Sequence, residues 1–116
     1  MRLNPESICQ IQIVEWIKNK TDLPFYHFAN ERKCSPQMGA ILKRMGVKPG
    51  VSDIFFPRSN HQFKGLWLEL KVGKNKATEA QVKFIDEMIA EGYSGLVAYG
   101  FDEAILMIKS FYQILS

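Results

Sequence analysis

Residues 66–72 read Leu-Trp-Leu-Glu-Leu-Lys-Val, and this stretch decides how the chain folds. Side chains of a strand alternate between its two faces, so Trp67, Glu69 and Lys71 share one face and leucines occupy the other. We expect such an apolar strand to be central and covered. Placing two charged side chains there is costly unless they pair or hold an ion. An ion pair at a sheet edge is the competing explanation, and for Glu-x-Lys taken alone it is the more common one.

Helical and strand-like patterns alternate on either side of this stretch. Asn4 is expected to cap a first helix that has Pro5 at its first position, and Thr78 is expected to cap a later one. The helices are predicted at residues 5–20, 36–45, 79 to about 92 and 102–115, and the strands at 25–28, 51–56, 66–72 and 95–99, with a hairpin loop at 57–65.

This order predicts an α/β domain with one central mixed sheet flanked by helices. The chain has no internal repeat, linker or low-complexity tract, so residues 1–116 are expected to form a single domain. The expected apolar faces are Ile8, Ile11, Val14 and Ile17 on the first helix, and Phe84, Ile85, Met88 and Ile89 on the helix after Thr78.

Composition excludes several classes of protein. Hydrophobic residues make up 47% and charged residues 23%, as in ordinary globular proteins. No stretch approaches the ~20 apolar residues of a membrane span, and the first residues lack a signal-peptide core, so we expect a cytoplasmic protein without membrane contact. Cys9 and Cys34 are too few for a disulfide framework, and with His27 and His61 they lack the paired spacing of a zinc site.

Charge is distributed unevenly along the chain. Residues 1–76 carry 13 of the 15 Lys and Arg against 6 of the 12 acids, whereas residues 77–116 carry two basic residues against six acids. A positive side attracts polyanions, of which nucleic acid is the commonest. This charge asymmetry alone is weak evidence for nucleic-acid binding, and it becomes useful only together with a candidate active site.

Asp53 supplies a second carboxylate. It follows the turn Pro49-Gly50 and precedes an apolar strand, and a hairpin over 57–65 would bring it within reach of Glu69. Two carboxylates beside a lysine suit Mg²⁺ or Mn²⁺. An ordinary turn-capping role for Asp53 remains open.

The sequence allows two interpretations of Gln81, which we weigh equally. It extends the apolar stripe of its helix toward the sheet. It also fits a capping box with Thr78, in which its side chain bonds back to the helix start.

Three segments together resemble the VRR-NUC nucleases, the virus-type replication-repair branch of the PD-(D/E)XK superfamily. They are Gly50-Val51-Ser52-Asp53, Trp67-Leu68-Glu69-Leu70-Lys71 and Thr78-Glu79-Ala80-Gln81. Asn30-Glu31-Arg32-Lys33, Gly39 and the run from Met45 to Gly50 extend the likeness over nearly the whole chain. Ser52 stands where the superfamily has a proline, a position expected only to shape the turn. The short chain resembles stand-alone phage and prophage members, and the resemblance implies a restriction-endonuclease-like core.

The resemblance implies a role for each matched residue. Asp53 and Glu69 would hold Mg²⁺ or Mn²⁺, with the backbone carbonyl of Leu70 as a further ligand. Lys71 would orient or activate the attacking water, and Gln81 would support the site from its helix.

An acid on the first helix commonly completes such sites, and Glu6 is our candidate. Glu6, Gln10, Ile13 and Ile17 share one helical face, whereas Glu15 is aimed less clearly inward. A first-turn glutamate that only complements the helix dipole is the alternative.

Five basic residues are expected to contact DNA phosphates, although a solvated surface role is the alternative for each: Arg32, Lys33, Lys74, Lys76 and Arg58. The resemblance implies a metal-dependent endonuclease acting on branched DNA such as a Holliday junction. The two-fold symmetry of that junction and the likeness to small resolvases favour a homodimer. A catalytically silent DNA-binding module and an RNA-processing nuclease are the alternatives.

Overall fold

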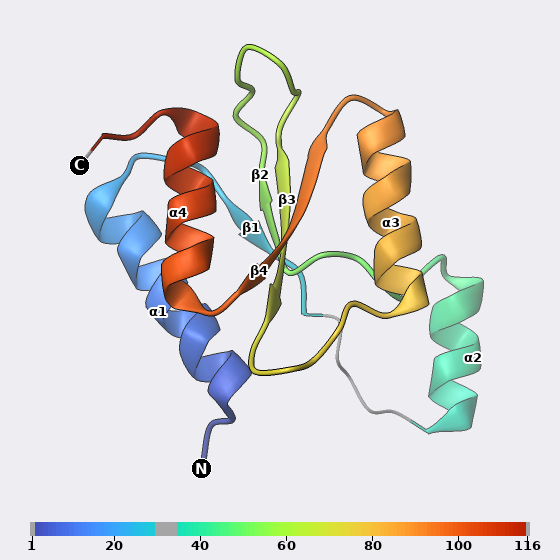
Figure 1. The fold of residues 1–116 in the computed structure, drawn as a ribbon. Coiled ribbons are helices and arrows are strands. Elements are labelled where there is room, and N and C mark those ends of the chain that lie inside the picture. The colour runs from blue at the N-terminus through green and yellow to red at the C-terminus, as the bar shows by residue number, and fades with distance from the viewer. Residues whose placement is uncertain (1, 30–34, 116) are drawn as a thin grey trace.

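The computed structural model describes residues 2–29 and 35–115. Helices and strands follow one another along the chain in an order close to the expected one (Figure 1). The elements are α1 (Pro5–Lys20), β1 (Tyr26–His27), α2 (Pro36–Arg44), β2 (Ile54–Phe56), β3 (Leu66–Lys71), α3 (Glu79–Ala90), β4 (Ser94–Tyr99) and α4 (Phe101–Tyr112).

The four strands form one mixed sheet in the order β1-β2-β3-β4. β1, β2 and β3 pair antiparallel, and β4 pairs parallel to β3 over the whole length of both strands. A parallel neighbour requires a crossover connection, which α3 provides. The stretch that decides the fold, β3, therefore lies inside the sheet, and the predicted α/β class is confirmed.

Helices cover both faces of the sheet. α1 and α4 lie side by side on one face, and α3 lies on the other (Figure 1). The main core fills the space between the sheet and the α1–α4 pair, where Ile13, Leu68 and Ile108 are fully buried. The leucines of β3 face this core, so Trp67, Glu69 and Lys71 face α3.

The predicted helix starts are confirmed by their capping hydrogen bonds. Asn4 accepts a hydrogen bond from the backbone of Ser7 at 2.8 Å, and Pro5 occupies the first turn of α1. Ser35 caps α2 in the same way. These side chains satisfy N–H groups that have no partner within the helix, which is why such residues mark helix starts in a sequence.

Several predicted boundaries were wrong. The strand expected at 51–56 is paired only over Ile54–Phe56, and the one expected at 25–28 only over Tyr26–His27. The last helix was expected to reach Leu115 but ends at Tyr112, because Gln113 adopts a left-handed conformation with φ of 55°. A residue in that conformation ends a helix.

Two predicted apolar faces were also partly wrong. Ile8 and Ile11 are 44% and 43% exposed, whereas Ile17 is buried as predicted, together with Cys9 and Ile13. On α3, Ile89 is exposed although Ile85 is buried. Apolar residues lie on every side of α1, so its periodicity does not favour one direction.

Helix α2 is set apart from this core. None of its residues is buried, and Figure 1 shows it beyond α3, away from the sheet. Its large apolar side chains Met38 and Ile41, with Met45 at its end, are about half exposed or more. None of the helices in the described ranges is long and apolar enough to cross a bilayer.

Gly50 fixes how closely α3 approaches the turn before β2. Its φ is +89°, and a Cβ at this position would collide with the backbone carbonyl of Ala80 in the first turn of α3. Gly46 has a similar φ of +96° but open space around it. Both glycines have a left-handed backbone, but only Gly50 is crowded, so substitutions at the two positions distinguish backbone strain from steric collision.

We expect Gly50→Ala to lower the free energy of unfolding by about 2–4 kcal/mol, since left-handed strain and overpacking add. Gly46→Ala should cost only about 1–2 kcal/mol, because it carries the strain alone. Urea denaturation of both variants measures the difference. Equal losses would show that the contact between Gly50 and α3 does not constrain the fold.

Candidate active site

The charged pair of β3 is buried inside the sheet. Glu69 is 1% exposed and Lys71 is 6% exposed, and the Lys71 Nζ lies 3.7 Å from the Glu69 Oε2. β3 has a neighbour on each side, so this is not an ion pair at a sheet edge. Two buried charges in contact require further partners to offset their lost hydration.

Asp53 reaches this pair through the backbone of β3. Its Oδ2 accepts a hydrogen bond of 2.7 Å from the N–H of Leu70. β2 pairs with β3 only as far as Ile54 and Leu68, so the Asp53 carboxylate takes the place of the next backbone acceptor in the ladder. The residue does more than cap a turn, because this bond holds it beside Glu69.

The carbonyl of Leu70 points to the same side as its N–H. In a strand both groups of one residue face the same neighbour, and those of the next residue face the opposite one. The Lys71 carbonyl accepts a hydrogen bond from Gly100, on the β4 side. The Leu70 carbonyl therefore faces the Asp53 side, as a metal ligand there would need to.

Gln81 satisfies both of the roles that its sequence allowed. Its Oε1 accepts a hydrogen bond of 2.8 Å from the Thr78 N–H, which completes the capping box at the start of α3. Its Nε2 donates at 3.0 Å to the Glu69 Oε2. One amide thus joins the first turn of α3 to the buried carboxylate.

The environment of Glu69 favours its neutral form. Burial is the main cause, and the negative charge of Asp53 adds to it, so that the pKa of Glu69 rises to about 8 although Lys71 opposes the shift. Glu6 also raises this pKa, which shows that it lies close enough to act on Glu69. Glu15, the other acid of α1, is exposed.

These donors fit a hard divalent cation. The Oε1 of Glu69 is buried and has no hydrogen-bond partner among the described residues. In the described part of the chain, no three His, Cys, Asp or Glu side chains lie close enough together to hold a metal. Glu6 is therefore near Asp53 and Glu69 but does not form a three-residue cluster with them. Mg²⁺ is commonly held by one or two carboxylates, with water and phosphate as its other ligands. Asp53, Glu69 and the Leu70 carbonyl form such a set.

Comparison with known proteins identifies the fold. No protein-family model matches the sequence, and no curated protein matches it. A solved structure described as a VRR_NUC domain protein superposes with a TM-score of 0.80 over 98% of this chain and 93% of its own, at 29% sequence identity. The chain is a VRR-NUC domain. Its mixed sheet and helices therefore have the fold that the sequence motifs predicted, and the domain belongs to a nuclease family.

The structure brings some of the predicted DNA contacts of this VRR-NUC domain together and not others. Lys74 and Lys76 are exposed in the loop from β3 to α3, between Lys71 and Gln81. Arg32 and Lys33 lie outside the described residues. Arg58 follows β2 and lies at the opposite end of the sheet from the site, since Phe56 pairs with the first residue of β3.

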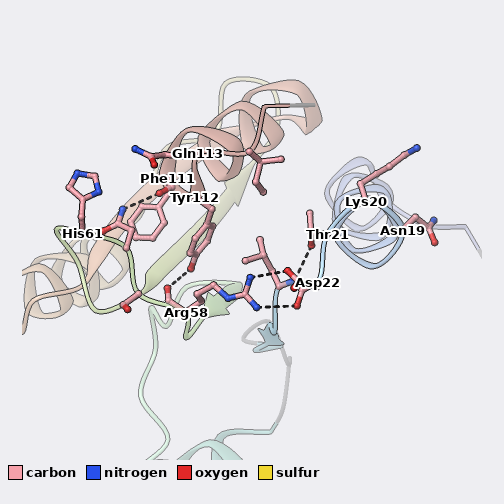
Figure 2. Close-up of a pocket in the computed structure, with 13 residues that line it drawn as sticks. Asn19, Lys20, Thr21, Asp22, Arg58, His61, Phe111, Tyr112 and Gln113 are labelled. Carbon is pink, nitrogen blue, oxygen red and sulfur yellow. Dashed lines mark hydrogen bonds and ion pairs between the residues drawn. The ribbon is translucent and has the colours of Figure 1, made fainter.

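Arg58 is engaged in a separate pocket of about 700 Å³ (Figure 2). Its Nη1 lies 2.9 Å from the Oδ1 of Asp22, and the Tyr112 hydroxyl donates to its backbone carbonyl at 2.7 Å. The one acid in the lining of this pocket, Asp22, is paired with Arg58, so the pocket does not repeat the chemistry of the Glu69 site.

Sequence reasoning missed the residues that hold Asp53 from the other side. The Phe28 N–H donates to the Asp53 carbonyl at 2.8 Å, and the His27 Nδ1 lies 2.9 Å from the same oxygen. The strand-like pattern at 25–28 was the only signal, and it does not say which strand lies beside it. Ser52, expected only to shape the turn, is fully buried.

The raised pKa of Glu69 predicts a pH-dependent stability. Between its ordinary value of 4.5 and about 8, the unfolded chain has lost the Glu69 proton and the folded chain still holds it. Unfolding then releases a proton, so rising pH destabilises the folded protein across this window. Without metal, we expect Glu69→Gln to match the wild type below pH 4.5 and to exceed its stability by roughly 1–3 kcal/mol near pH 8.

Denaturation in EDTA at several pH values measures this difference. Glu15→Gln removes an exposed carboxylate from α1 and serves as the control. Its stability relative to the wild type should not increase with pH. A gain for Glu69→Gln that is constant from pH 4 to pH 8 would contradict the raised pKa.

Proposed function

We propose that this VRR-NUC domain is a DNA endonuclease that hydrolyses phosphodiester bonds with Mg²⁺ or Mn²⁺. The observation that carries the proposal is the contact of buried Glu69 with three groups: Asp53 beside it, Lys71 at 3.7 Å and Gln81 at 3.0 Å. Carboxylates placed in this way can hold a divalent cation, and a lysine beside them adds positive charge where a phosphate would react.

A module that only binds DNA has no use for such a pair. Phosphate binding needs exposed lysines and arginines, and a buried carboxylate opposes it. Glu69 also destabilises the fold, because its ionised form is disfavoured where it lies. Retaining a costly group at the centre of the sheet is typical of a catalytic site.

The residues divide the work between them. Asp53, Glu69 and the Leu70 carbonyl would hold the cation, which when bound lowers the pKa of a water and polarises a phosphoryl oxygen. Lys71 places an ammonium where the phosphate gains negative charge as the water oxygen adds to phosphorus and the bond to the leaving oxygen breaks. Gln81 holds the Glu69 carboxylate in one orientation, and Glu6 adds negative charge near the cation site.

Lys74 and Lys76 would receive the DNA backbone beside this site. Both are exposed in the loop that joins Lys71 to α3. Contacts to phosphates give affinity that falls with salt and does not depend on base sequence. Recognition by DNA shape, as in four-way junctions and flaps, is the form of selectivity that this arrangement allows. We place the activity in the cytoplasm of a bacterial cell, as that of a phage or prophage protein.

A homodimer would place two such sites on the two strands of a four-way junction. An isologous interface needs a self-complementary apolar surface on each copy. The stripe Met38, Ile41 and Met45 of α2 is exposed, and large exposed apolar patches mark interaction sites. We propose that this stripe forms the dimer contact.

The nuclease is tested by incubating purified protein with labelled duplex, flap, four-way-junction and single-stranded DNA in Mg²⁺, Mn²⁺ or EDTA. We expect cleavage with metal alone and a loss of at least a hundredfold in rate for Glu69→Gln, because one lost electrostatic contact in an active site costs about that much. Binding of DNA should survive the substitution, since Glu69 is not a phosphate contact.

The matched control is Glu15→Gln, which removes an exposed carboxylate of α1 and should cleave like the wild type. DNA binding without cleavage in either metal would leave a catalytically silent binding module. Faster cleavage of RNA than of DNA of the same shape would assign the site to RNA processing.

The dimer is tested by sedimentation equilibrium of the free protein. Ile41→Lys should weaken self-association at least tenfold, because a lysine at the centre of an apolar contact loses its hydration. Ala40→Lys adds the same charge on the opposite side of α2 and should remain dimeric. A wild-type protein that is monomeric, or an Ile41→Lys variant that still dimerises, would overturn this interface.

A further inference from the structure

Aromatic side chains lie on the same sheet face as the catalytic carboxylates. The register aligns Tyr26, Phe55 and Trp67 across β1, β2 and β3. Two residues further along each strand, the same face carries Phe28, Asp53 and Glu69. The hydrogen bond from Phe28 to the Asp53 carbonyl confirms that these two residues are neighbours.

Among the described residues, no helix covers the part of the sheet face next to Phe28. α3 covers the β3–β4 half, where Phe84 packs edge-on against Trp67 at 4.9 Å between ring centroids. On the β1–β2 half, Phe28 is 40% exposed and Tyr26 is 60% exposed. Large aromatic side chains therefore remain accessible next to the site.

The Phe28 ring packs against a second aromatic ring. Its centroid lies 5.6 Å from that of Trp67 with the planes tilted by 37°, and Trp67 stacks on Phe55 at 4.3 Å. A ring supported in this way loses little conformational freedom when a second flat group covers its other face. The exposed part of the Phe28 ring is accessible to a planar partner.

A nucleobase is the planar group that the surroundings select. Adjacent strands are ~5 Å apart, so Phe28 lies one strand away from Asp53 and within the reach of a single nucleotide bound there. Lys74 and Lys76 offer charge complementary to the backbone of that nucleotide. In an intact duplex the base faces are already stacked, so only an unpaired base can lie on Phe28.

We propose that Phe28, supported by Trp67, stacks on an unpaired base next to the phosphate that is cleaved. This inference rests on the proposed nuclease and deepens it, because it gives the site a physical reason to prefer branched DNA. An unpaired nucleotide occurs where a flap begins, and the aromatic ring would hold it while the phosphate reaches Asp53 and Glu69. Phe28 acts as a specificity residue and takes no part in the chemical step.

The test is a double-mutant cycle between the ring and the base. Binding is measured with flap DNAs in which each unpaired nucleotide near the branch is replaced in turn by an abasic one, on a Glu69→Gln background that prevents cleavage. At one position the abasic change should weaken binding about tenfold with Phe28 present, since a stacked base contributes that much. With Phe28→Leu the same change should cost almost nothing, and with Phe28→Trp the tenfold loss should return.

A direct readout accompanies the cycle. 2-Aminopurine at the sensitive position should lose fluorescence on binding to proteins with Phe28 or Phe28→Trp and not to Phe28→Leu. Thermal unfolding of the variants checks that the Phe28→Leu fold is intact, and Tyr26→Leu serves as a second aromatic control in which the coupling should persist.

The possible outcomes separate the two proposals. Cleavage by the wild type with no coupling at any position overturns the stacking and leaves the nuclease. Coupling without cleavage in any metal overturns the nuclease and leaves a domain that stacks on unpaired bases. No binding to any of these DNAs overturns both.

Discussion

The burial of one carboxylate at the centre of the sheet is the constraint on which the rest of this VRR-NUC domain depends. Glu69 is 1% exposed, and each of its neighbours comes from a different element. Lys71 comes from its own strand, Gln81 from α3 and Asp53 from the turn before β2. A buried acid is tolerated only where such partners are held in place, so the positions of α3 and of the turn are tied to this one side chain.

The attachment of α3 illustrates how local and distant bonds support each other. The Gln81 amide closes the capping box with Thr78 and also reaches Glu69. The capping bond fixes the rotamer, so little side-chain entropy remains to be lost when the second bond forms. Gly50 allows the backbone of the turn to approach the same first turn of the helix. The start of α3 is thereby held both to β3, which carries Glu69, and to the turn that carries Asp53.

The parts of the fold that depend on local chemistry could be predicted from the sequence. Alternation along residues 66–72 separated Glu69 and Lys71 from the leucines, and the caps Asn4 and Thr78 marked helix starts, because both effects act within a few residues. The direction of α1 could not be predicted, since Ile8 and Ile11 compete with Ile13 and Ile17 and only tertiary packing chooses between them. The sequence also offered no reason to choose between the two roles of Gln81. The structure shows that Gln81 has both, because one of its hydrogen bonds is local and the other reaches the sheet.

The fold places positive and negative side chains at opposite ends of α3. α3 runs away from the site for ~18 Å. Two of its three acids, Asp86 and Glu87, lie toward the far end of the sheet, whereas Lys74 and Lys76 precede its first turn, which carries only Glu79. A polyanion approaching along α3 meets repulsion at one end and attraction at the other. The helix covers only the β3–β4 half of its face, so the approach that satisfies both conditions passes over β1 and β2, where Phe28 lies beside Asp53. Under the proposed function, the charge gradient and the half-covered sheet would bring a phosphate backbone to the same place by independent physical effects.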